Sequence, residues 1–477
     1  MDLHEYAKYD AVGLRDLIAS GAVSATEVED AARRALAEAD PKVNGLALPV
    51  FTPALAHAAD GPFSGVPFLI KDHGPVAEGV PFFLGSRALP GIVTHHDTDL
   101  MTRFRAAGLV TLGLTTAPEM SLSFATESLK YGVTRNPWDP ARGVGGSSGG
   151  AAALVAAGAV PVAHASDGAG SIRVPASCCG LVGLKPSRGR VTSGPDMGEP
   201  MLGMAYEFAL TRTVRDAAHL LDAVHGPGVG DKYSAPPPGG RYADDAGTEP
   251  GRLRVAVTTE SWAGTKVDEQ VAAWATRAGH VLEQAGHAVR AATPAVDWEA
   301  VTQAWVAEGV AISSTLLLAP RQPDPAAMEA VSRRFLETAN EWTALDLLSA
   351  LNAQNRVTRS VGAFFTEYDL LVTPTLGHLP APHGTLRYDD PEHTLASWLH
   401  SLTEYGPFTT LFNVTGQPAI SLPLGQSEDG LPIGVQIVAP YGREDLLFQV
   451  AAHLEQAMPW KDRTPPVFAG KQPAADL

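Results

Sequence analysis

The sequence has almost no cysteine: among its 477 residues only the neighbours Cys178 and Cys179 occur. Adjacent cysteines rarely pair with each other, so a disulfide framework is excluded as the support of the fold, and a reducing compartment is expected. Thiol chemistry is one interpretation of this pair. Burial as small apolar side chains is the favoured one, because free cysteine is among the most buried residue types.

The chain is also poor in charge, especially positive charge. Only 18% of its residues are charged, and the formal net charge is −17. Such a protein is repelled by nucleic acid phosphates and by anionic membrane surfaces, so neither is expected as a partner. We expect no apolar run long enough to span a bilayer, and the N-terminus lacks the basic and apolar regions of a signal peptide. These absences predict a cytoplasmic protein.

Glycine and serine are concentrated in one stretch, residues 136–190. Its first feature is the run GGSSGG, in which glycines surround Ser147 and Ser148 with backbone that tolerates positive φ and the close approach of a ligand. The residues that follow predict a short helix over 151–157 and a buried strand over 160–165. The two serines are therefore expected on a constrained turn ahead of a helix.

A second turn follows the predicted strand, with the sequence Asp-Gly-Ala-Gly-Ser over residues 167–171. Successive small residues before a serine can point several backbone N–H groups into one space. An oxyanion hole requires that arrangement of donors. The stretch is thus suited to expose hydroxyl groups rather than to fill a core.

The run GGSSGG, the later D-G-A-G-S-I-R-V-P-A-S and the following G-L-V-G-L-K-P-S-R-G-R resemble the signature of the amidase signature family of serine hydrolases. In that family the serine ending the second turn is the nucleophile, and a first-turn serine beside a cis peptide bond relays its proton to a lysine. By position, the resemblance implies Ser171 as nucleophile and Ser147 as relay, with Ser148 the less favoured relay. It also implies an oxyanion hole formed by the backbone N–H groups of Gly168, Ala169, Gly170 and Ser171.

The lysine is expected upstream on an apolar strand, and Lys71 follows such a run at residues 65–70. An ordinary lysine has a pKa of about 10.4 and accepts no proton at neutral pH unless burial lowers that pKa. Asp72 would oppose the lowering if it faced the same way, but alternation along a strand points it to the other side. Without the two serine turns, Lys71 would be interpreted as a solvated surface charge. With them, it is the expected base.

One residue departs from the family pattern. Ala169 stands where most members have glycine, and its Cβ would strain the turn if that position required positive φ. We interpret the alanine as subfamily variation, because Gly168, Gly170 and Ser171 are intact.

Strand and helix patterns alternate through residue 224 and predict an α/β fold, with a mixed central sheet covered by helices on both faces. Residues 226–252, which include three consecutive prolines, predict an exposed loop. Residues 298–365 predict a helical, variable region, which in the family contributes to the substrate pocket. The resemblance covers nearly the whole chain and implies one catalytic domain over residues 1–477.

The second turn and the segment 194–199 look most like the branch that contains nylon-oligomer hydrolases, which open cyclic aminohexanoate dimers, and aryl- and alkyl-amidases. This resemblance implies hydrolysis of the C–N bond of neutral or apolar amides, whether linear, aryl or cyclic, and leaves esterase or carbamate activity open. One alternative is the glutaminase subunit of a transfer-RNA amidotransferase, which needs a partner and a charged recognition site. Another is a catalytically silent binding protein of the same fold, although all three catalytic positions are present.

The expected partner is a small-molecule amide, and a homodimer is left open. No metal or organic cofactor is implied. His95, His96 and Asp97 lack the second spaced pair of ligands that a metal site needs, so a solvated loop is the better interpretation.

Overall fold

A computed structural model describes residues 1–73, 77–319 and 322–471 of the chain. Its central element is a ten-stranded sheet in the order β2-β1-β5-β7-β6-β11-β12-β10-β8-β9. The pairs of β1 with β2 and β5, and of β8 with β9 and β10, are parallel, whereas the strands between them pair antiparallel. The strands are β1 (Pro67–Lys71), β2 (Val110–Thr115), β5 (Val162–Asp167), β6 (Val182–Lys185), β7 (Tyr206–Thr211), β8 (Arg254–Val257), β9 (Ala288–Ala291), β10 (Leu370–Pro374), β11 (Ala419–Gln426) and β12 (Pro432–Val438), with a separate hairpin of β3 (Glu127–Ser128) and β4 (Gly132–Val133).

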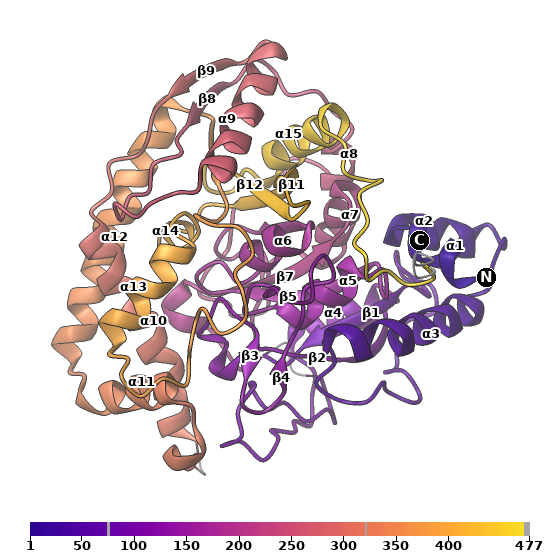
Figure 1. Ribbon diagram of the computed structural model, residues 1–477, viewed down its shortest axis with the longest axis horizontal. Helices are drawn as coiled ribbons and strands as arrows, with labels where there is room; N and C mark the ends of the chain where they lie inside the picture. Colours follow the sequence, from indigo (N-terminus) through magenta and orange to yellow (C-terminus); the bar gives the residue numbers. More distant parts are fainter. Residues whose placement is uncertain (74–76, 320–321, 472–477) are drawn as a thin grey trace.

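Helices pack on both sides of this sheet (Figure 1), which confirms the expected α/β class. At β11 and β12, for example, α9 and α15 lie on one side and α6 on the other. The helices are α1 (Leu3–Lys8), α2 (Ala11–Ala19), α3 (Ala25–Val43), α4 (Asp99–Ala106), α5 (Gly149–Ala156), α6 (Arg173–Cys179), α7 (Val214–Val224), α8 (Tyr242–Asp245), α9 (Glu269–Gln284), α10 (Trp298–Leu318), α11 (Ala330–Glu341), α12 (Ala344–Glu367), α13 (Leu395–Tyr405), α14 (Thr410–Thr415) and α15 (Glu444–Ala457).

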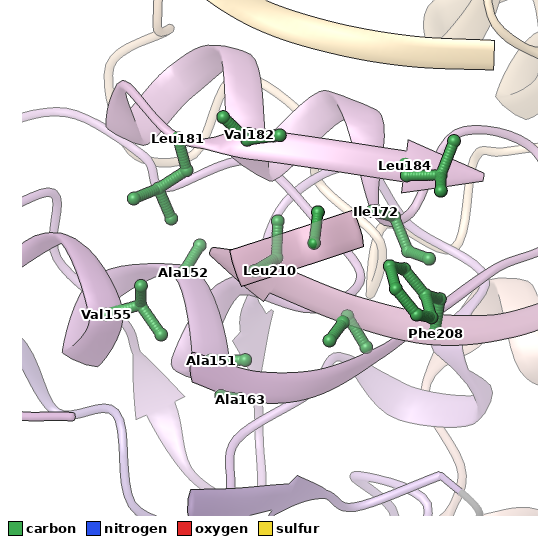
Figure 2. Close-up of a cluster of buried hydrophobic side chains, with 14 of the residues drawn as sticks. Ala151, Ala152, Val155, Ala163, Ile172, Leu181, Val182, Leu184, Phe208 and Leu210 are labelled. Carbon is green, nitrogen blue, oxygen red and sulfur yellow. The ribbon is translucent and has the colours of Figure 1, made fainter. Parts of the chain in front are cut away.

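The glycine- and serine-rich stretch folds into the middle of the molecule. It supplies α5, β5, α6 and β6, whose small and branched side chains pack together with β7 (Figure 2). The labelled side chains of this cluster, from Ala151 on α5 to Leu210 on β7, are fully buried or nearly so. The turn before α5 and the turn between β5 and α6 therefore rest on a packed core, which holds their serines in place.

Two expectations from the sequence need correction. Helix α10 has 21 residues and a mean hydropathy of 1.3 over an 18-residue window, so by length and composition alone it could cross a membrane. In the fold it packs against α11 and α12 as part of the core. The segment 226–252 is not wholly an exposed loop, because it contains α8, whose Tyr242 is buried against Phe448 of α15.

Both cysteines are free and buried, as expected. Burial raises the pKa of the Cys178 thiol to about 12. A thiolate is the reactive form of cysteine, so this shift argues against thiol chemistry at the pair.

Two helical glycines differ in the space around them. A Cβ at Gly150 on α5 would lie 2.4 Å from the carbonyl oxygen of Gly45, whereas a Cβ at Gly362 on α12 would meet nothing within 4 Å. We expect Gly150→Ala to lower the free energy of unfolding by about 1–3 kcal/mol, because overpacking forces the backbone to shift. The matched control Gly362→Ala should raise it by about 0.5–1 kcal/mol, because alanine is the better helix former. Urea denaturation followed by circular dichroism measures both changes, and destabilisation of equal size in the two variants would contradict this account.

Candidate active site

Lys71 is the last residue of β1 and is completely buried. Strand β1 lies between β2 and β5 and is buried along its whole length. The Lys71 Nζ lies 2.7 Å from the Ser147 Oγ and 2.8 Å from the Ser166 Oγ. The structure therefore brings Lys71 and Ser147, which are 76 positions apart in the sequence, into direct contact.

Burial lowers the pKa of the Lys71 amine to about 7, against the opposing charges of Glu207, Asp167 and Asp72. The Asp72 carboxylate faces other partners, since it accepts hydrogen bonds from the backbone N–H of Gly85 and from the Tyr131 hydroxyl. This agrees with the alternation expected at the end of the strand. Lys71 is thus partly neutral at pH 7.

A buried histidine lies beside the lysine. The backbone N–H of Lys71 donates to the Nδ1 of His164 at 3.3 Å, so the ring proton is on Nε2, which donates to the Glu207 Oε2 at 2.6 Å. Burial, with Lys71 nearby, holds the pKa of His164 well below its ordinary value, so the imidazole is neutral. His164 therefore supports the backbone of Lys71 without adding a charge.

In the first turn, the peptide bond between Gly146 and Ser147 is cis. Ser148 is bound within the turns: its Oγ donates to the carbonyl oxygen of Ser166, and its N–H donates to the carbonyl oxygen of Ser171. Ser147 contacts the lysine, whereas Ser148 ties the first turn to the strand before the second. The two neighbouring serines thus have different partners.

The second turn is held by a buried ion pair. Asp167 and Arg173, at its two ends, are both fully buried, and their closest atoms are 2.8 Å apart. Burial raises the pKa of the Asp167 carboxyl, but the Arg173 guanidinium and the Asn413 amide outweigh it and hold the pKa below its usual value. Arg173 also donates to the Gln436 side chain at 2.7 Å, which connects the turn to β12. The turn is therefore rigid at both ends.

The backbone conformation and the packing of the second turn restrict which amino acids can stand in it. Gly170 has φ +143°, and a Cβ there would lie 2.4 Å from the Thr409 Oγ1. The Thr409 and Thr410 hydroxyls donate to the carbonyl oxygen of Ala169 at 2.6 and 3.1 Å. Ala169 itself does not have positive φ, so its Cβ causes none of the strain considered from the sequence.

Four consecutive backbone N–H groups of this turn make no hydrogen bond to other described residues. They belong to Gly168, Ala169, Gly170 and Ser171. The carbonyl oxygen of Ala169 points toward Thr409 and Thr410, and the carboxylate of Asp167 accepts the N–H groups of Ile172 and Arg173 instead. These four donors are therefore available to a ligand.

A cavity opens beside the two turns. It is lined by Ser147, Ser166 and Ser171, by Gly168 and Ala169, and otherwise mainly by apolar side chains from residues 122–124, 201–205, α10, α11 and α13. The apolar lining includes Phe124, Met201, Trp305, Phe335, Trp398, Leu399 and Leu402. Among the described residues, its lining has no lysine or arginine, and a buried carboxyl group, Glu308, is part of its wall.

The sequence predicted Lys71, Ser147 and Ser171 as site residues. In the structure Lys71 contacts Ser147, and Ser147 and Ser171 line the same cavity as Ser166. The sequence-based prediction missed Ser166, His164 and Glu308. Ser166 directly precedes the second turn and could have been found from that position. His164 and Glu308 carry no local signal, because a single polar residue inside an apolar strand or helix gives no indication of what it faces.

The sequence model described as Amidase matches residues 27–448 of this chain. The 6-aminohexanoate-cyclic-dimer hydrolases of Paenarthrobacter ureafaciens and of Pseudomonas sp. strain NK87 are each 39% identical to it, with 98% of both chains covered. A solved structure of a 6-aminohexanoate cyclic dimer hydrolase complexed with substrate superposes with a TM-score of 0.89 at 38% identity, covering 97% of this chain and 99% of that one.

The ion pair at the second turn predicts a large stability effect. Replacing Arg173 by methionine leaves the buried Asp167 without its partner, and we expect a loss of about 3–5 kcal/mol in the free energy of unfolding. The control is Arg334→Met, which breaks an Arg334–Glu337 pair that is about half exposed and should cost less than about 1 kcal/mol. Chemical denaturation measures both. Equal losses in the two variants would show that the buried pair does not hold the turn.

Proposed function

This chain belongs to the amidase signature family and is a hydrolase of carbon–nitrogen bonds other than peptide bonds; we propose that it cleaves neutral or apolar amides through an acyl-enzyme on Ser171. The observation that carries the proposal is the contact of 2.7 Å between the buried Lys71 Nζ and the Ser147 Oγ, at a cavity that Ser171 also lines. A neutral amine in that place can accept a proton, and a serine in contact with it can pass one on.

In the proposed reaction, neutral Lys71 accepts the proton of Ser147, and Ser147 accepts the proton of Ser171 as the Ser171 Oγ attacks the amide carbonyl carbon. Ser166 assists by accepting an N–H of the lysine, which directs the lysine's lone pair toward Ser147. The proton returns to the leaving nitrogen when the C–N bond breaks. Water then attacks the ester formed on Ser171, by the same proton route, and releases the acid.

The oxyanion of the tetrahedral intermediate is expected to bind the free N–H groups of the second turn. Four such donors are available, and the Asp167–Arg173 pair and the two threonines hold them in place before substrate arrives. Donors that are already oriented stabilise the developing charge without reorganising. Loss of a single donor of this kind costs on the order of 100- to 1,000-fold in rate.

The cavity favours neutral and apolar amides as substrates. Its wall of aromatic and aliphatic side chains contributes binding energy through burial of apolar surface. The described lining offers no cation to a carboxylate, which a glutaminase would need for the α-carboxylate of glutamine. The two relatives above act on a cyclic dimer of 6-aminohexanoate. We therefore include cyclic diamides, along with linear and aryl amides, in the substrate class.

The nucleophile is tested by amine release, measured by mass spectrometry, from an anilide, a linear alkyl amide, a cyclic diamide and glutamine. We expect the wild type to turn over the neutral amides, and Ser171→Ala to lose activity by on the order of 10⁴-fold or more, because the covalent step is removed. Cys179→Ala should still turn over substrate and controls for a thiol nucleophile. Turnover of glutamine alone would contradict the substrate class, and activity in Ser171→Ala would contradict the nucleophile.

The base is tested by the pH dependence of kcat/KM. Because Lys71 must be neutral to accept a proton and its pKa is about 7, activity should rise as the pH is raised through about 7 and level off above it. Lys71→Arg should be inactive across the whole range, since a guanidinium is not deprotonated in proteins. A flat profile between pH 5 and 9, or an active arginine variant, would rule out Lys71 as the base.

A further inference from the structure

A carboxyl group that the proposed mechanism does not use lies in the wall of the cavity. Glu308, on α10, is only 2% exposed and lines the same cavity as Ser147 and Ser171. Its Oε2 is buried and has no hydrogen-bond partner among the described residues. A Cβ built on Gly168 would lie 2.3 Å from the Glu308 Oε1, so this carboxyl group is in contact with the nucleophile turn.

An unpartnered carboxyl in such a place is costly. A buried polar group without a hydrogen bond loses its hydration and gains nothing in return, at about 1–3 kcal/mol. The other cavity side chains contributed by the surrounding helices, such as Trp305, Phe335 and Trp398, are apolar or aromatic. A leucine at position 308 would fill the wall without this penalty, so the carboxyl group points to a ligand that hydrogen-bonds with it.

The surroundings of Glu308 favour the neutral form of its carboxyl group. Burial, and secondly the negative charge of Asp167, raise the pKa of its carboxyl well above the ordinary value. Among the described residues, no lysine or arginine lines the cavity and stabilises the ionised form of this carboxyl group. A neutral carboxylic acid has an O–H that donates and a carbonyl oxygen that accepts. Its natural partner in an apolar cavity is therefore another neutral polar group, such as an amide.

We propose that Glu308 is a specificity-determining residue, whose O–H donates to the carbonyl oxygen of a second amide in the substrate while Ser171 attacks the first. The enzyme thereby prefers a diamide to the monoamide that lacks the second amide group. The proposal rests on the function proposed above and narrows its substrate class. It also fits a cyclic dimer of an amino acid, which by its chemistry carries two amide bonds.

Three substrates that differ only at the far end of the acyl chain test this preference. They are N-butylhexanamide, 6-acetamido-N-butylhexanamide and 6-amino-N-butylhexanamide, and kcat and KM are measured from butylamine release by mass spectrometry. The enzymes are the wild type, Glu308→Gln, which keeps a neutral donor and acceptor, and Glu308→Leu, which fills the same space without either. Ser171→Ala is the blank.

We expect the wild type and Glu308→Gln to prefer the acetamido substrate to N-butylhexanamide by roughly tenfold in kcat/KM, as one buried hydrogen bond predicts. Glu308→Leu should lose that preference, mainly through KM; the preference is the ratio of kcat/KM for the two substrates within one variant, so a change in its overall rate does not enter the comparison. Turnover of N-butylhexanamide by Glu308→Leu also shows that this variant is folded.

Two outcomes would overturn the proposal. In the first, Glu308→Leu keeps the wild-type preference for the second amide. In the second, the amino substrate is the preferred one and Glu308→Gln abolishes that preference, which would make Glu308 a carboxylate that binds a cation. Either result leaves the proposed function intact as long as the wild type releases butylamine and Ser171→Ala does not.

Discussion

The site depends on the burial of one lysine. An ammonium group at the end of β1 would have to leave water for an environment of apolar strands and serine hydroxyls, and that desolvation is what lowers the pKa of Lys71 to about 7. Strand β1 lies inside the sheet, between two parallel neighbours, and the Lys71 side chain is completely buried there. The sheet thus supplies more than a scaffold, because it sets the protonation state on which the proposed proton route relies.

The two serine turns complete the site by different means. The first is held by packing and by Ser148, which ties it to Ser166 and to Ser171. The second is held by charge, through the buried Asp167–Arg173 pair that its ends contribute and that reaches across to β12. Buried pairs of this kind are seldom a net gain in stability, since both charges are desolvated. Their value here is geometric, because four N–H groups of the turn make no hydrogen bond to other residues that the structure describes, and Gly168, Ala169 and Ser171 line the cavity.

The sequence supports the prediction of most of this arrangement. The serine turns and the apolar strand before Lys71 are local patterns, so the residues that meet in the site could be named before their contacts were known. The start of α3 is another local signal, because the sequence Ser24-Ala25-Thr26-Glu27 has the capping-box pattern and the structure contains that box. Fold class followed from the alternation of strand and helix patterns.

The remainder could not be predicted, because it depends on contacts between distant residues. The partners of Arg173 lie up to 263 positions away, and nothing near Glu308 in the sequence indicates a cavity. The apolar composition of α10 does not distinguish a core helix from a membrane helix, and only its packing against α11 and α12 does so. In residues 226–252, the run of prolines led to the prediction of an exposed loop, whereas the segment contains a short helix with a buried tyrosine.

The most direct test of the central claim is the pKa of Lys71 itself. It can be measured in the resting enzyme by following the ¹³Cε signals of labelled lysine by NMR between pH 5 and 10, with the Lys71 signal assigned by its absence from Lys71→Met. The account predicts a midpoint near 7, well below that of an exposed lysine at about 10.4. A Lys71 that remains protonated up to pH 10 would contradict it, because no neutral base would then be present at the pH where the enzyme must work.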